Sequence, residues 1–95
     1  MAAFSARTIT FAVHGPILRT DLPGLCARVC RLLERAGPEL ALCEVGGVPA
    51  DAVTADALAR LQLAAHRHGC RVQLLNASAD LVELLAFLGL EDVLP

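Results

Sequence analysis

The sequence predicts a single α/β domain in which helices pack against a mostly parallel or mixed central sheet. Short apolar segments typical of strands alternate along the chain with longer segments of helical periodicity. The connections between them span only a few residues, which favours right-handed β-α-β crossovers. A chain of 95 residues has room for one hydrophobic core, so we expect one domain over residues 1–95.

The first strand is predicted at Thr8–His14, where strongly apolar side chains alternate with polar or small ones. Ile9, Phe11 and Val13 point to one side and Thr8, Thr10 and Ala12 to the other, so one face of the strand is more apolar. Residues 1–6 precede this strand and would form a short or frayed strand of their own.

The first helix is predicted from an N-cap at Asp21 to Ala36. Pro23 fits the first turn, where its missing N–H costs no hydrogen bond, and Gly37-Pro38 ends the helix. Apolar residues recur at helical spacing and form a stripe expected in the core, namely Leu22, Leu25, Val29, Leu32, Leu33 and Ala36.

The segment Leu40–Val45 is almost continuously apolar, which is typical of a strand covered on both faces. We therefore place it in the interior of the sheet. A loop at Gly46–Pro49 leads to a second helix from about Val53 to His68, closed by Gly69. The side of this helix expected in the core carries Leu58, Leu61, Ala65 and His68.

A third strand at Arg71–Leu75 and a third helix complete the pattern. Ser78 supplies the N-cap, and Gly89 followed by Leu90 is typical of a helix end in left-handed geometry with a hydrophobic contact. The expected core positions of this helix are Leu81, Leu84, Leu85 and Leu88.

Composition excludes several classes of protein. Hydrophobic residues make up 56% of the chain, which excludes disorder, and the net charge of −2 offers no basic field for nucleic acid. No apolar run approaches the roughly 18 residues of a membrane span. Because no apolar segment with a cleavage site stands at the N-terminus, we expect no signal peptide and a cytoplasmic protein.

Cysteine and histidine pairs raise the question of a metal site. Cys26 and Cys30 lie four residues apart on one side of a helix and could in principle share a metal, but small apolar core residues are the favoured interpretation. His66 and His68, near Cys70, diverge by about 200° on a helix. We expect the histidines to interact with the carbonyl end of the helix, and we expect no metal and no other cofactor.

No motif indicates an enzyme. Gly46-Gly47 lacks the spacing of a nucleotide-binding loop, and a turn explains it better. Asp51 follows a strand, yet no acidic pair after the first strand would hold Mg²⁺ beside it, so we expect it to cap the second helix. No serine or cysteine stands in a nucleophile motif with an adjacent base, and we therefore expect no catalytic residues.

The side of the second helix that faces away from the core carries Leu63. It lies beside Asp56, Ala59 and His66 when successive residues are turned by about 100°. A single exposed leucine is ordinary and needs no function. An apolar side chain among polar neighbours could equally anchor a protein partner, and both interpretations stay open.

From Thr8 onward the chain resembles the STAS domain, the fold of bacterial anti-sigma factor antagonists. GPILRTDLPGLCARVCRLL resembles the turn into the first helix of that family, and LALCEVGGV resembles its central strand, with Glu44 where the family usually has Asp. VQLLNASADLVELLAFLGLEDVL is similar to its closing strand, turn and helix. The order, spacing and coverage of these segments carry the resemblance.

The sequence departs from the family at the regulatory loop. The phosphoregulated members read Asp-Ser-Ser-Gly there; an alignment anchored on Gly69 places Asp51 on that Asp and Ala52 on the phosphorylated serine. An alignment anchored on Glu44 shifts the serine position to Val53. Neither residue has a hydroxyl, so Thr54 is the nearby alternative phosphoacceptor. The family's first N-terminal strand is missing, or reduced to residues around Phe4.

The resemblance implies a non-enzymatic, protein-binding module in transcription regulation whose partner is a kinase-type anti-sigma factor. The residues expected to form the partner surface are Asp51, Ala52, Val53, Thr54, Asp56, Ala59 and Leu63. Two alternatives stay open. One is a STAS subunit that docks on a lipid-transport ABC ATPase, and the other is an α/β domain that binds a small ligand or acts as an enzyme.

Overall fold

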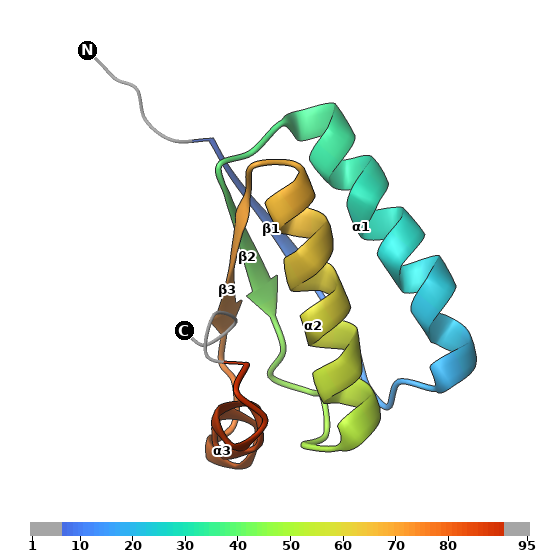
Figure 1. Ribbon diagram of the computed structural model, residues 1–95, viewed down its shortest axis with the longest axis vertical. Helices are drawn as coiled ribbons and strands as arrows, with labels where there is room; N and C mark the ends of the chain where they lie inside the picture. Colours follow the sequence, from blue (N-terminus) through green and yellow to red (C-terminus); the bar gives the residue numbers. More distant parts are fainter. Residues whose placement is uncertain (1–6, 91–95) are drawn as a thin grey trace.

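Strands and helices alternate along the chain, which confirms the predicted α/β class (Figure 1). The computed structural model describes residues 7–90, so the strand predicted within residues 1–6 lies outside the described residues. The elements are β1 (Thr8–Ala12), the short 3₁₀ helix η1 (Arg19–Asp21), α1 (Leu22–Ala36), β2 (Leu40–Glu44), α2 (Ala52–Arg67), β3 (Arg71–Leu75) and α3 (Ala79–Phe87).

The described strands form one parallel sheet in the order β1-β2-β3. The interior position predicted for Leu40–Val45 is therefore confirmed. The register aligns Thr10 with Leu42 and Leu42 with Gln73. Because all strands run the same way, their carboxyl ends and the loops that leave them meet at one edge of the sheet.

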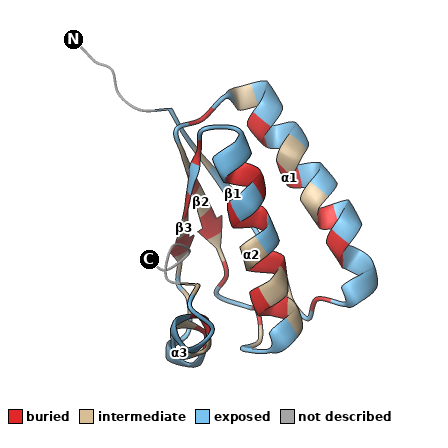
Figure 2. Cartoon of the chain, viewed as in Figure 1, coloured by how far each residue is buried: buried red, intermediate tan, exposed pale blue. Residues whose placement is uncertain are grey.

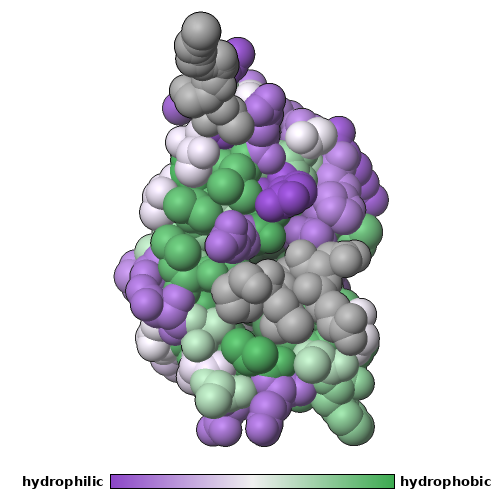
Figure 3. All heavy atoms as spheres, turned by 90° about the vertical axis from the view of Figure 1, so that its left-hand side faces the viewer, coloured by the Kyte–Doolittle hydropathy of each residue, from purple (hydrophilic) through white to green (hydrophobic). Residues whose placement is uncertain are grey.

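Helices α1 and α2 pack on one face of this sheet, and α3 lies at its end (Figures 1 and 2). Cys43 of β2 and Leu74 of β3 are buried beneath α2, whereas Leu40 and Leu42 are only half-buried. Figure 3 shows the opposite side of the molecule, where apolar side chains gather. None of the described helices covers that side, so the expectation that Leu40–Val45 is covered on both faces does not hold within residues 7–90.

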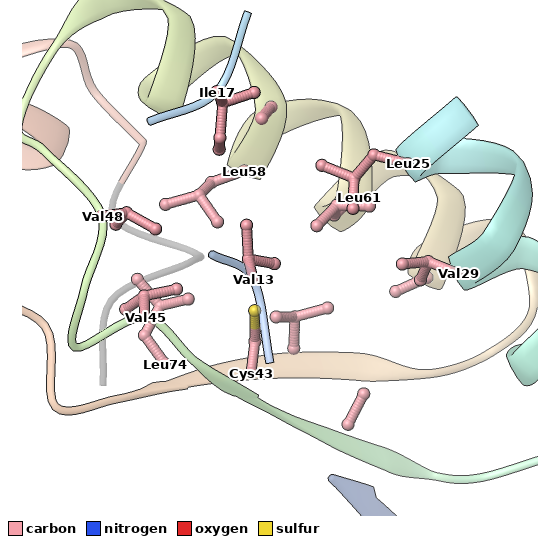
Figure 4. Close-up of a cluster of buried hydrophobic side chains, with 14 of the residues drawn as sticks. Val13, Ile17, Leu25, Val29, Cys43, Val45, Val48, Leu58, Leu61 and Leu74 are labelled. Atoms are coloured by element: carbon pink, nitrogen blue, oxygen red, sulfur yellow. The ribbon is translucent and has the colours of Figure 1, made fainter. Parts of the chain in front are cut away.

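The core lies between α2 and the sheet (Figure 4). Leu58 and Leu61 project from α2 toward the strands, where Cys43 and Leu74 meet them. All four side chains are buried, which is the arrangement that the apolar periodicity of α2 predicts. Within residues 7–90, no helix combines the length and hydropathy needed to cross a membrane.

Three of the predicted core positions are wrong. Leu32 is 43% exposed because it lies at the margin of the α1 stripe, about 100° from the buried Leu33. Leu88 is 48% exposed and His68 is also exposed. These two residues stand one position past the last residue of α3 and of α2, so the chain has left the helical phase that would bury them.

Asp21 precedes α1 as predicted, but its side chain does not cap that helix. Its Oδ2 atom instead accepts the backbone N–H of Leu18 at 3.0 Å. The reason is the η1 turn, which occupies the residues just before α1 and offers its own unpaired N–H group.

Candidate functional site

The loop between β2 and α2 ends at Asp51, which caps α2 as the sequence predicts. Asp51 has an extended backbone, and its Oδ1 atom accepts the backbone N–H of Thr54 at 2.8 Å. The pKa of the Asp51 carboxyl is lower than its usual value of 3.8. The hydrogen bond from the Thr54 backbone is the largest cause, and the Thr54 side chain is the second. The cap fixes the first turn of α2 against the loop.

The residues after Asp51 differ in their access to solvent. Ala52 is exposed and Val53 is half-buried, whereas Thr54 is 0% exposed. A kinase could reach the Thr54 hydroxyl only if the first turn of α2 opened. Phosphorylation of Thr54 stays a prediction, and Ala52 is the accessible residue at the position where the resemblance places a serine.

The outward side of α2 exposes the leucine predicted there. Leu63 is 58% exposed, which confirms the helical phase, and Ala59 beside it is half-buried. Asp56, one turn nearer the loop, forms ion pairs with Arg60 (Nε to Oδ1, 2.9 Å) and with Arg19 (Nη1 to Oδ2, 3.4 Å). The pKa of the Asp56 carboxyl is below its usual value, mainly because of Arg60 and to a smaller extent because of Arg19.

Arg19 and Arg60 were not among the predicted site residues. The spacing of Asp56 and Arg60, four apart on a helix, is a signal from which their ion pair could have been predicted. Arg19 gave no such signal, because it reaches α2 from η1, which only the tertiary packing brings near. Both arginines pair with Asp56, so charged side chains lie beside the residues predicted to bind the partner.

Glu44, at the end of β2, joins two loops at the carboxyl edge of the sheet. Its Oε1 atom accepts the N–H of Gly46 at 2.7 Å, and its Oε2 atom accepts Nδ2 of Asn76 at 2.5 Å. Asn76 has a positive φ of 60°, a conformation that asparagine tolerates better than most residues. The carboxylate therefore fixes the β2–α2 loop to the residue that follows β3, a contact that the sequence did not reveal.

The described cysteines and histidines form no metal site. Cys43 is buried, and burial raises its thiol pKa to about 12, so it packs as a neutral side chain. Cys26 and Cys30 are half-buried on α1. His66 lies 3.1 Å from Gln62, measured between their Nε2 atoms. Over residues 7–90, no group of three or more His, Cys, Asp or Glu side chains is placed to share a metal ion.

No family model matches the sequence, and no curated protein matches it either. The fold and the geometry of the loop and of α2 define a small α/β domain with an exposed helix face. Its resemblance to the STAS family rests on the order and spacing of sequence segments alone.

We expect the cap at the start of α2 to make stability depend on pH. A carboxyl group with a lowered pKa stabilises the folded state above its usual pKa, and that stabilisation is lost as the pH falls through the folded-state value. Asp51→Asn keeps a capping oxygen without the charge. Thermal unfolding followed from about pH 7 to about pH 2 should therefore show a smaller loss of Tm in the variant. Identical pH profiles would mean that the Asp51 charge does not stabilise the cap.

Proposed function

We propose that this chain is a non-enzymatic regulatory module of the STAS type that binds a protein partner through the Asp51 loop and the outward side of α2. The observation that carries the proposal is Leu63, 58% exposed on a helix whose opposite side is buried in the core. An apolar side chain on a rigid element is the kind of residue that anchors protein interfaces.

The surroundings of Leu63 support this role. The Asp51 cap bonds the first turn of α2 to the loop, and the ion pair between Asp56 and Arg60 joins successive turns of the helix. A preorganised surface loses less conformational entropy on binding than a flexible one does. The charged side chains of Asp56 and Arg60 would form the polar rim of the interface around an apolar centre.

The partner that the resemblance suggests is a kinase-type anti-sigma factor. In that family, a phosphate on the loop brings nearly two negative charges against the docking surface and disfavours binding. Ala52 cannot accept a phosphate, and Thr54 is buried. We therefore propose that the docking surface is not switched off by phosphorylation at the family's usual position.

Capture of partners by the tagged full chain, followed by mass spectrometry and calorimetry, tests the proposal. Leu63→Asp should weaken the affinity for the captured partner by about tenfold or more, because the new carboxylate would lose its hydration in the interface. The fold should persist, since Leu63 faces water in the free protein. Leu88→Asp changes another exposed leucine, just past the end of α3, and should leave affinity unchanged.

Three outcomes would contradict the proposal. Equal losses of affinity in the two variants would show that the change of charge, and not the position, matters. Unchanged affinity in Leu63→Asp would place the interface elsewhere. Capture of a transport ATPase in place of an anti-sigma factor would retain the docking surface but replace the proposed partner.

A further inference from the structure

Helices α1 and α3 carry matching side-chain patterns of opposite charge. On α1, Arg28 and Arg31 are followed by Leu32, at the spacing i, i+3 and i+4. On α3, Asp80, Glu83 and Leu84 have the same spacing. The eighth residue of each pattern, Arg35 on α1 and Phe87 on α3, also lies on the same side of its helix.

The α1 pattern borders a groove of about 320 Å³ between that helix and β1, an edge strand among the described strands. Phe11 of β1 and Leu32 form part of its apolar lining, and Arg28, Arg31 and Arg35 also line it. The three arginines are exposed and form no ion pair with any residue in the range 7–90. We name this surface the basic groove.

The α3 pattern surrounds a shallow hollow on the far end of the molecule. Asp80, Glu83, Leu84 and Phe87 line it, and Phe87 is 87% exposed. Neither carboxylate forms an ion pair with another described residue. We name this surface the acidic face. Phe87 therefore places exposed apolar surface beside two carboxylates that have no ion-pair partner among the described residues.

We propose that the acidic face of one molecule docks on the basic groove of a second copy. The carboxylates would pair with the arginines, and Phe87 would enter the apolar lining near Leu32. Within one molecule the contact cannot form, because α3 lies at the end of the sheet and away from α1 (Figure 1). Arg31 and Glu83 each lie near the middle of their pattern. They would therefore face each other whether α1 of one copy and α3 of the other run parallel or antiparallel.

The association is expected to be weak, because each pattern spans only two turns of helix and small interfaces are transient. It uses surfaces other than the outward side of α2 and does not depend on the proposed function. Leu63→Asp should therefore leave the association unchanged.

Charge exchange between two variants provides the test. Arg31→Glu and Glu83→Arg should each be monomeric in sedimentation velocity, because each brings like charges together between identical copies. An equimolar mixture of the two variants should associate again. In the mixture, position 31 of each variant meets position 83 of the other, and each such pair has opposite charges. The apparent dissociation constant of each variant alone should rise by about tenfold or more over that of the unmodified chain, and the mixture should recover most of this loss.

Two variants with the same changes in charge serve as controls. Arg67→Glu on α2 and Glu39→Arg before β2 alter exposed residues that line neither surface, so each should associate as the unmodified chain does. Circular dichroism should show the same helix content in all variants.

The proposal is overturned if the unmodified chain stays monomeric at every concentration and salt level. It is also overturned if the mixture stays monomeric, or if the control variants lose association to the same extent. A monomeric protein that binds phosphatidylglycerol vesicles through Arg31 would assign the basic groove to a membrane surface and exclude a second copy as its occupant.

Discussion

Leu61→Ala is expected to lower the free energy of unfolding by about 2–5 kcal/mol. Leu61 is 0% exposed, and it projects from α2 into the core beside Leu25 and Val29 of α1 (Figure 4). The substitution removes buried apolar surface and leaves a cavity between the two helices that the surrounding side chains fill only in part. Urea denaturation of the purified domain measures the loss, provided that the m value stays the same.

Leu63→Ala is the matched control for this substitution. The two leucines are two residues apart on the same helix, and Leu63 is 58% exposed. The same chemical change should therefore alter stability by no more than about 0.5 kcal/mol. Similar losses in the two variants would show that the two sides of α2 are not buried as the structure has them, and would also remove the basis of the proposed docking surface.

The sequence was sufficient to predict the order of the strands and α-helices and the orientation of α2, but not the short helix η1. Apolar residues at helical spacing separate Leu58 and Leu61 from Leu63, and the structure places these residues on opposite sides of the helix. The continuous apolar run of β2 predicted its interior position correctly. Such patterns are local, so each can be detected without knowledge of the rest of the chain.

What could not be predicted depends on segments that are distant in sequence. Asn76 meets Glu44 only because β2 and β3 are neighbours in the sheet, and Arg19 reaches Asp56 only because η1 packs near α2. Leu32 shows the same limit. Leu32 lies at the margin of the buried stripe of α1. Because α1 packs near the edge of the sheet, Leu32 lines a groove there and is not buried in the core.

The candidate site also combines a feature that the sequence predicts with one that depends on tertiary packing. Asp51 could be recognised as a cap because the bond from Thr54 spans only three residues. The burial of Thr54 could not be predicted from its polarity, because it follows from the packing of the first turn of α2. That burial bears on regulation, since it leaves Ala52 as the accessible residue of the loop and withdraws the nearby hydroxyl from solvent.

Gly15→Ala is expected to destabilise the domain by about 1–3 kcal/mol, with a value near the upper end. A Cβ atom at Gly15 would lie 2.6 Å from Cδ of Pro49 and 3.0 Å from Cα of Val48. Neither a proline ring nor a backbone atom can move aside as a flexible side chain would. The loop after β1 and the loop before α2 must therefore separate, which loosens the packing of the buried Val13, Ile17 and Val48 (Figure 4).

Gly47→Ala is the control, because a Cβ atom there would meet no atom within 4 Å and Gly47 does not have a positive φ. That variant should match the unmodified chain within about 0.5 kcal/mol, or gain slightly because the unfolded chain becomes less flexible. Urea denaturation of both variants measures the difference. If Gly15→Ala were as stable as Gly47→Ala, the two loops would not approach as closely as the structure has them.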